Sequence, residues 1–154
     1  YATQFGFELA IVRPANVFGY GHFRGGSGGG RTVQSLVEAG LSGEPLVISA
    51  GQARGFEYVY CKDLGRALRR AATVPISGVT AFNAGNGEVV SFEELAGAVR
   101  TVLPRLAVTV GDGPRQSFKQ PMDLSRSKAV LDWSPEYSLV DAFRDYVDEL
   151  KAAR

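Results

Sequence analysis

Short apolar runs alternate with longer segments of helical periodicity along most of the chain, and this alternation constrains the fold more than any other feature. LAIVRP, residues 9–14, is a continuous apolar run that ends at a proline, which is typical of a strand buried on both faces of a parallel sheet. Strands that alternate with helices define the α/β class, which we predict here. Four further runs resemble short strands: PLVIS (45–49), FEYVY (56–60), VTAFNAG (79–85) and LAVTV (106–110).

The segments between these runs carry helix periodicity and helix end signals. A capping box of Ser91 and Glu94 is the strongest of these signals, because each residue can satisfy a backbone N–H group of the other. The predicted helices are residues 31–40; residues 63–74, with Asp63 as N-cap and Pro75 after the end; residues 91–103; residues 125–133, stopped by Pro135; and residues 138–153, with Ser138 and Asp141 at the start.

Composition excludes several classes of protein. The 154 residues suit one domain, and the net charge of +1 provides no basic field for nucleic acid. Cys61 is the only cysteine, so no disulfide forms within the chain and a cytoplasmic location is expected. A single histidine, His22, argues against a histidine-based metal site, and we predict no metal. The longest apolar run is too short to cross a membrane.

GGSGGGRT, residues 25–32, differs by one residue from the P-loop that cradles nucleotide phosphates. Arg31 stands where the P-loop has lysine, and a planar guanidinium does not replace a point charge. The preceding residues also lack a strand pattern. We interpret the segment as a glycine-rich connection into a helix, and a P-loop NTPase is the weakest of three functional alternatives.

Ligands of open α/β sheets bind at the carboxyl ends of the strands, and two short stretches occupy such positions. Residues 14–16 follow the LAIVR run, and residues 83–85 follow the VTAF run. Asn16 is the sharper candidate, because its amide can both donate and accept hydrogen bonds. An asparagine that caps the turn after the strand explains its position equally well. The position of Asn16 therefore leaves a ligand-binding and a capping role open.

Four stretches in order resemble the extended short-chain dehydrogenase/reductase family, specifically its NAD-dependent sugar epimerases and dehydratases. RPANVFGYG is similar to the family's R-P-x-N-V-Y-G-P-G turn, and YVYCKDLGRAL to its Y-V-x-D-x-A-x-A segment. FNAGNGEVVSFEELA and DLSRSKAVLDWSPEYSLVDAF resemble the two motifs that follow. Where the family has glycine in L-G-W, this chain has Asp132, which tolerates the helix-end conformation that the position requires.

The resemblance is to the second half of the family only, so we expect the chain to be part of a longer protein. The dinucleotide fingerprint and the catalytic Tyr-x-x-x-Lys would lie before residue 1, and Tyr1 resembles the tail of the catalytic helix. The implied fold is the end of a Rossmann-type parallel sheet plus the small C-terminal substrate domain. Residues 1–23 and 61–85 would complete the Rossmann-like domain, and residues 24–60 and 86–154 would bind substrate.

The resemblance also implies a function. The parent would oxidise a nucleotide-sugar hydroxyl transiently with bound NAD (or NADP) and return or redirect the hydride, and it would be a homodimer. The second alternative is a non-catalytic Rossmann-like protein that binds a nucleotide or a partner. The sugar, the base and the choice between epimerisation, dehydration and reduction depend largely on residues outside this sequence.

Carried over residue by residue, the resemblance gives this chain binding residues but no catalytic residue. The expected cofactor contacts beside the nicotinamide are Pro14, Ala15 and Val17. Asn16 is expected to bind the substrate pyrophosphate. Arg54 is a further candidate for the pyrophosphate, although it lies two residues earlier than in the family motif, a shift that keeps the same face of a strand. Weaker candidates are Arg115 and Lys119.

Tyr58 and Lys62 match the catalytic Tyr-x-x-x-Lys by spacing alone. In the family the pair lies on a helix, where residues i and i+4 are neighbours. Here the segment has the composition of a strand, in which the two side chains would lie about 13 Å apart. We therefore predict that Tyr58 is a strand residue outside the chemistry.

Overall fold

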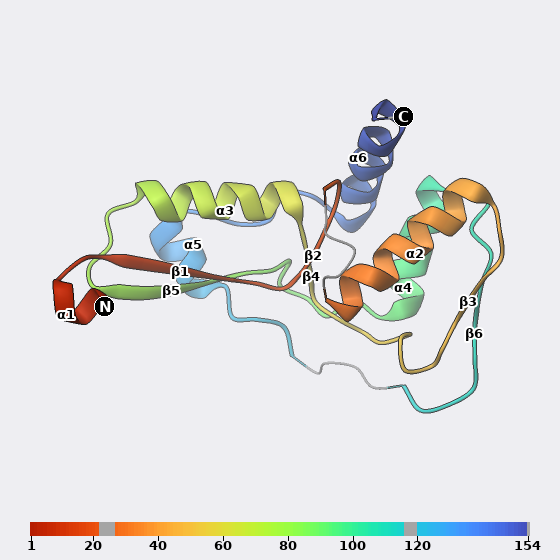
Figure 1. Ribbon diagram of the computed structural model, residues 1–154, viewed down its shortest axis with the longest axis horizontal. Helices are drawn as coiled ribbons and strands as arrows, with labels where there is room; N and C mark the ends of the chain where they lie inside the picture. The colour runs from red at the N-terminus through yellow and green to blue at the C-terminus, as the bar shows by residue number, and fades with distance from the viewer. Residues whose placement is uncertain (22–26, 116–119, 154) are drawn as a thin grey trace.

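The computed structural model describes residues 1–21, 27–115 and 120–153. Helices and strands alternate as the sequence predicts, and the described chain is of the α/β class (Figure 1). The helices are α1 (Ala2–Phe5), α2 (Gly28–Ser42), α3 (Cys61–Thr73), α4 (Phe92–Val102), α5 (Ser125–Leu131) and α6 (Leu139–Ala152). The strands are β1 (Leu9–Pro14), β2 (Asn16–Phe18), β3 (Leu46–Ile48), β4 (Tyr58–Tyr60), β5 (Val79–Ala84) and β6 (Val108–Val110).

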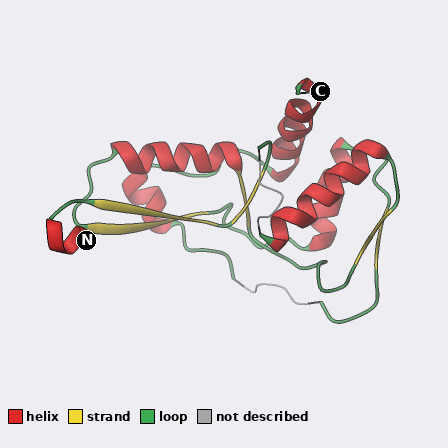
Figure 2. Cartoon of the chain, viewed as in Figure 1, coloured by secondary structure: helices red, strands yellow, loops and turns green. Residues whose placement is uncertain are grey.

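The six strands of the described chain pair in parallel, in three separate pairs (Figure 2). β1 pairs with β5, from Leu9 opposite Val79 to Pro14 opposite Ala84. β2 pairs with β4, and β3 pairs with β6. At least one helix lies between the two strands of each pair along the chain, as parallel pairing requires and as the predicted alternation of strands and helices indicates.

The helices divide the apolar interior into two cores. α3 and α5 cover one face of the β1–β5 pair, where Phe82, Leu131 and Trp133 are buried. α2, α4 and α6 gather around the β2–β4 pair, as Figure 1 shows, in a larger core that contains Leu36 and Phe143. β2 begins just after β1 ends, so the carboxyl end of β1 lies at the boundary between the two cores.

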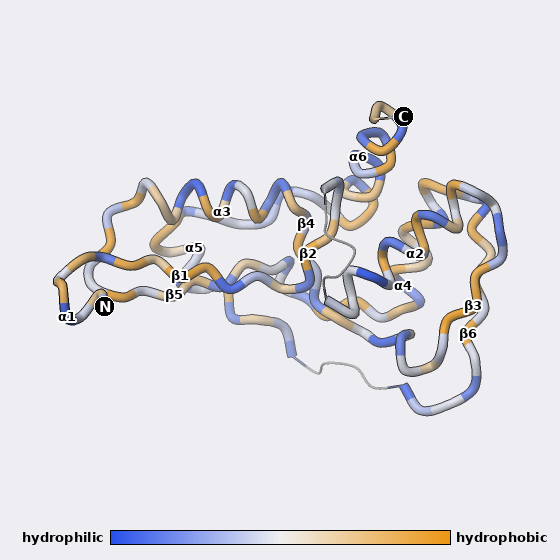
Figure 3. Tube along the Cα trace, viewed as in Figure 1, coloured by the Kyte–Doolittle hydropathy of each residue, from blue (hydrophilic) through white to orange (hydrophobic). Residues whose placement is uncertain are grey.

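Within the described residues, residues 9–14 are buried on one face and not on both as predicted. Leu9 and Ile11 are 39% and 37% exposed, whereas Ala10 and Val12 pack against the core under α3. Val79, the partner of Leu9 in β5, is also 52% exposed. The apolar stretch of β1 in Figure 3 is therefore covered on one face only by the described residues. A sequence run reports apolar character, and only the packing of other elements determines whether a face is covered.

Several predicted helix ends are confirmed. Ser91 and Glu94 form the expected capping box of α4, and the Ser138 hydroxyl accepts the backbone N–H of Asp141 at the start of α6. Asp132 ends α5 with φ of 48°, the left-handed conformation expected where the family has glycine. These ends follow from local sequence because each capping contact spans only a few residues.

The predicted N-cap of α3 is wrong. The helix begins at Cys61 with Tyr60 as N-cap, and Asp63 lies within its first turn. The Asp63 carboxylate is buried and accepts the backbone N–H groups of Glu136 and Tyr137, and its carbonyl accepts Trp133 Nε1. Asp63 thus joins α3 to the segment before α6. Its carboxylate accepts N–H groups of that segment and caps no N–H group at the start of α3.

Two elements were not predicted from the sequence, and a third is longer than expected. α1 is a single turn, and β2 occupies part of the stretch that resembles the family's turn. α2 begins at Gly28 instead of near residue 31, because Ser27 caps it by accepting the N–H of Gly30. The cap makes the glycines 28–30 the first turn of a helix.

Candidate functional site

Asn16 lies where β1 passes into β2. The backbone N–H of Ala15 donates to the Ala84 carbonyl, which holds the end of β1 against β5. Both the backbone N–H of Asn16 and its side-chain Nδ2 donate to the Glu57 carbonyl, at 3.1 Å each. The amide is therefore fixed in orientation, with its donor directed at the backbone before β4.

The first turn of α2 packs against Asn16. A Cβ atom on Gly29 would lie 2.8 Å from both Cγ and Oδ1 of Asn16, so no larger residue fits at Gly29 without a shift. Glycine at this position allows the helix N-terminus to approach the amide closely. The positive end of a helix dipole favours anions, so the start of α2 and Asn16 together form a polar surface suited to a phosphate.

A cavity of about 310 Å³ lies beside this turn. Two guanidinium side chains, Arg31 of α2 and Arg54, contribute to its wall. Arg54 lies outside β4, so the expectation that it shares a strand face with the family position is wrong; its Nε donates to the Gly51 carbonyl. The lining residues are Gly28, Arg31, Gly51, Gln52, Arg54 and Phe56.

A second cavity, of about 160 Å³, is bordered by Asn16 and the residue that follows the end of β1. Its described lining residues are Ala15, Asn16, Glu57, Gln120 and Met122. Ala15 and Asn16 thus share one cavity, as the strand-end rule predicts. Adjacent glycines of α2 lie near both cavities, because Gly28 lines the larger one and Gly29 packs against Asn16, which lines the smaller one.

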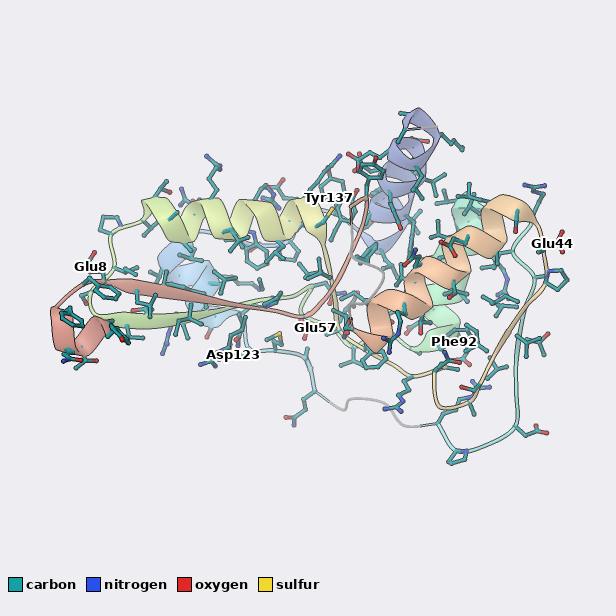
Figure 4. The ribbon with its side chains drawn as sticks, in the orientation of Figure 1. Glu8, Glu44, Glu57, Phe92, Asp123 and Tyr137 are labelled. Carbon is teal, nitrogen blue, oxygen red and sulfur yellow. The ribbon has the colours of Figure 1, made fainter. Side chains whose placement is uncertain are left out.

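Glu57 is a buried residue of this site that no sequence motif revealed. Its side-chain Oε1 accepts the N–H of Gly87 at 2.9 Å, and Oε2 accepts the N–H of Met122 at 2.6 Å. Its backbone carbonyl meanwhile holds Asn16. Glu57, which is labelled in Figure 4 and is 7% exposed, therefore connects β2, the loop after β5 and the segment before α5. Local sequence gave no signal for it, because its side-chain partners are 30 and 65 residues away.

Gly85 is required by the Glu57 side chain. A Cβ atom at Gly85 would lie 1.9 Å from Glu57 Oε1 and 2.6 Å from its Cδ, so even alanine displaces the carboxylate. We expect Gly85→Ala to lower the free energy of unfolding by about 1–3 kcal/mol, the usual cost of overpacking. Denaturant unfolding measures this loss.

Gly97→Ala is the matched control for Gly85→Ala. Gly97 lies inside α4, and an added Cβ there would meet no atom within 4 Å. Alanine should therefore stabilise the helix by up to about 1 kcal/mol. Equal effects of the two substitutions would contradict the fit of the Glu57 side chain over Gly85.

The remaining predicted binding residues are less close to one another. Pro14 ends β1, and Val17 is half-buried in β2 opposite Val59. Arg115 is exposed and pairs with Glu93 at the start of α4. Lys119 lies outside the described residues. The roles of all these residues, and of Asn16 and Arg54, stay predictions.

In the described part of the P-loop-like segment, the groups that a P-loop uses to bind phosphate and Mg²⁺ form hydrogen bonds within the segment itself. Gly30 N–H donates to Ser27, and the hydroxyl of buried Thr32 donates to the Gly28 carbonyl. Thr32 occupies the position whose hydroxyl a P-loop uses to hold Mg²⁺. The structure therefore gives no support to the NTPase alternative; residues 25 and 26 of the motif lie outside the described residues.

The surroundings of Tyr58 and Lys62 agree with the prediction that they are not a catalytic pair. Tyr58 is in β4 as predicted, with 1% exposure, and burial raises the pKa of its phenol. Lys62 lies in the first turn of α3 and forms ion pairs with Asp145 and Glu149 of α6, at 2.6 and 2.9 Å. A tyrosine base needs a lowered pKa and a nearby cation. Tyr58 has the opposite shift, and Lys62 is engaged elsewhere.

Tyr58→Phe should leave turnover of the full-length protein within a few-fold of the parent. The Tyr58 hydroxyl is buried, and no described residue gives it a hydrogen-bond partner. Its removal should therefore change the free energy of unfolding by no more than about 1 kcal/mol, and in the stabilising direction. Steady-state kinetics with thermal unfolding test both statements. A thousandfold loss in kcat, about 4 kcal/mol of barrier, would restore the catalytic interpretation.

Two classes of site are absent from the part of the chain that the structure describes. It holds no group of three or more histidine, cysteine, aspartate or glutamate residues placed to bind a metal ion. Among the same residues, no helix has the length and apolar character needed to cross a membrane.

Comparison with known proteins identifies the class of protein. The profile of the NAD dependent epimerase/dehydratase family matches residues 1–85, which is more than half of the 154 residues. The chain belongs to this family, which confirms the resemblance drawn from its motifs.

The particular relatives are nucleotide-sugar enzymes. A dTDP-4-dehydro-6-deoxy-D-allose reductase from a Streptomyces species is 32% identical over 139 residues, which cover 88% of this chain and 41% of that protein. UDP-glucuronic acid decarboxylase 6 of Arabidopsis thaliana is 28% identical over 144 residues, 90% of this chain and 40% of that protein. The chain therefore spans less than half the length of the curated relatives it matches.

Solved structures show that the fold is that of the family's Rossmann-type epimerases. UDP-glucuronic acid 4-epimerase from Bacillus cereus, in complex with NAD, has a TM-score of 0.78 at 22% identity. The match covers 99% of this chain and 48% of that one. UDP-N-acetylglucosamine 4-epimerase from the same organism also gives 0.78, at 19% identity, over 98% and 48% of the two chains.

Proposed function

We propose that this chain is the C-terminal, substrate-binding part of an NAD-dependent nucleotide-sugar epimerase/dehydratase. The observation that supports the proposal most is the placement of Asn16. Its amide lies just after the carboxyl end of β1, against the first turn of α2, and it borders the smaller cavity. Family membership and the names of the relatives point to the same class of ligand.

The pyrophosphate of the substrate would bind at the larger cavity. Arg31 and Arg54 supply positive charge there, and Gly28 begins the helix whose N-terminus favours anions. Asn16 would contribute its amide from the adjacent cavity. Guanidinium groups and helix N–H groups are the donors that diphosphates require, so this wall suits the nucleotide end of a nucleotide sugar.

NAD, or NADP, would supply the hydride acceptor and donor, held mainly by the N-terminal part of the family's Rossmann fold. In this chain Pro14, Ala15 and Val17 would lie beside the nicotinamide. The small side chain of Ala15 leaves space after the end of β1, in the cavity that Asn16 shares. The exposed apolar residues of β1 and β5 would be covered by the N-terminal part. Residues 1–23 and 61–85 would then complete the cofactor domain.

The reaction proposed for this chain is defined at the level of the family. The relatives include a reductase and decarboxylases of a sugar acid, so their names alone select no single sugar. No residue of this chain is assigned to proton or hydride transfer. We further propose that the full-length protein is a cytoplasmic homodimer that binds neither nucleic acid nor membranes.

The isolated chain of residues 1–154 should catalyse no NAD-dependent turnover of a nucleotide sugar. The acid/base tyrosine and the dinucleotide fingerprint of the family are not in this sequence. Absorbance at the reduced-nicotinamide band, with UDP- and dTDP-sugars as substrates, gives the measurement. Measurable turnover by these residues alone would contradict the assignment of catalysis to another part of the protein.

The proposed function is tested by titration calorimetry on the full-length polypeptide that carries these residues. A nucleotide sugar should bind to the NAD complex, while ATP with Mg²⁺ should produce no binding heat at the glycine-rich segment. Absence of nucleotide-sugar binding would favour the non-catalytic alternative, and ATP binding lost on deletion of two glycines from residues 25–30 would favour the NTPase.

A further inference from the structure

The smaller cavity has a charge pattern that bears on the sugar itself. If the pyrophosphate lies at Arg31 and Arg54 and the nicotinamide lies at Pro14 and Ala15, the reacting sugar must lie between them. The cavity of about 160 Å³ suits that place, because Ala15 and Asn16 both line it. This assignment rests on the proposed function.

Glu57, an acidic residue, lines this cavity, and no described lining residue is a cation. Glu57 is fixed by the backbone N–H groups of Gly87 and Met122, so its side chain cannot rotate away without the loss of both hydrogen bonds. Gly85 leaves just enough room for the carboxylate where it lies. The carboxylate is therefore held in place by two separate segments of the chain, the loop after β5 and the segment before α5.

We propose that Glu57 makes the sugar compartment selective for neutral sugars and against sugar acids. A ligand carboxylate in the cavity would lie near the like charge of Glu57, whose burial makes screening by water weaker than at an exposed site. A neutral hexose has no such repulsion, and its hydroxyl groups can donate to the remaining lone pairs of the Glu57 oxygens. Met122 and Ala15 add apolar wall that suits a sugar carbon bearing no charge.

The test compares matched pairs of ligands on the full-length protein with NAD bound. UDP-glucose is paired with UDP-glucuronate, and dTDP-glucose with dTDP-glucuronate, so that the members of each pair differ at one sugar carbon, which bears a carboxylate or a neutral hydroxymethyl group. We expect the neutral member of at least one pair to bind about ten- to a hundredfold more tightly, as expected for a like charge close to a desolvated carboxylate. Equal affinities, or tighter binding of the glucuronate, would overturn the proposal while nucleotide-sugar binding itself stands.

Two variants assign the selectivity to Glu57. Glu57→Gln removes the charge and should reduce the preference for the neutral sugar to within about threefold. Met122→Lys leaves the backbone N–H of Met122 on the carboxylate and adds a cation to the cavity wall; it should raise glucuronate affinity about tenfold. The second variant tests the proposal even if Glu57→Gln does not fold. An unchanged preference in the folded variants would contradict the assignment.

Asp63→Asn is the matched control. Asp63 is also a buried carboxylate that accepts two backbone N–H groups, those of Glu136 and Tyr137, but it does not line the sugar cavity. The variant should lower the melting temperature and leave the preference for neutral sugars unchanged. A loss of preference in this control would show that the effect follows stability and not the charge of Glu57. Failure of every nucleotide sugar to bind would contradict the proposed function, and this inference with it.

Discussion

Asn16→Ala is expected to weaken nucleotide-sugar binding by the full-length protein about ten- to a hundredfold. Hydrogen bonds to a charged partner contribute about 1.5–3 kcal/mol, and the amide lies beside the α2 N-terminus where a pyrophosphate would bind. NAD affinity should change much less, because most cofactor contacts are proposed to lie in the N-terminal part of the protein. Titration calorimetry with each ligand separates the two effects.

Asn83→Ala is the control for Asn16→Ala. Asn83 also follows the apolar part of a strand, and its Nδ2 donates to the Asp123 carbonyl at 2.9 Å, as Asn16 Nδ2 donates to the Glu57 carbonyl. Each substitution should reduce the free energy of unfolding by about 0.5–1.5 kcal/mol. Only Asn16→Ala should also reduce substrate affinity. If the two substitutions change both stability and substrate affinity equally, Asn16 has only a structural role. That role is the one its hydrogen bonds to the Glu57 carbonyl provide.

Phe143→Ala should reduce the free energy of unfolding by about 3–5 kcal/mol, the largest loss that we expect from a single substitution. Phe143 has no exposed surface, and its ring centroid lies 5.1 Å from that of Phe18. The pair joins α6 to β2, the strand that begins at Asn16. Truncation leaves a cavity in the larger core. The helices and strands that surround Phe143 prevent this cavity from closing.

Denaturant unfolding measures the effect of Phe143→Ala, with Leu68→Ala as the control. Leu68 is 51% exposed on α3, so its truncation should change stability by about 0.5 kcal/mol or less. A loss below about 1 kcal/mol for Phe143→Ala, well under the usual cost of such a truncation, would mean that α6 contributes little to holding the β2–β4 pair.

Sequence motifs predicted the identity of the binding residues better than their orientation. Residues 14–16 could be predicted as a site because they end or directly follow an apolar strand, and the structure places Ala15 and Asn16 in one cavity. Arg54 could be selected for its chemistry, yet the expected strand orientation is wrong because the residue lies before β4 and outside the strand. Charge and residue type are local properties, but the direction of a loop side chain depends on the elements around it.

The sequence by itself determined the order and type of most elements, because strand runs, helix periodicity and caps such as Ser91, Glu94 and Ser138 depend on contacts a few residues apart. Only the tertiary structure showed that Glu57 holds Asn16 through its carbonyl while its carboxylate binds the backbone of two distant segments. It also decided that Asp63 joins two segments, and that one face of β1 is exposed. These contacts join residues that lie tens of positions apart. Which residues meet in these contacts depends on how whole helices and strands pack, and a local sequence pattern carries no information on that packing.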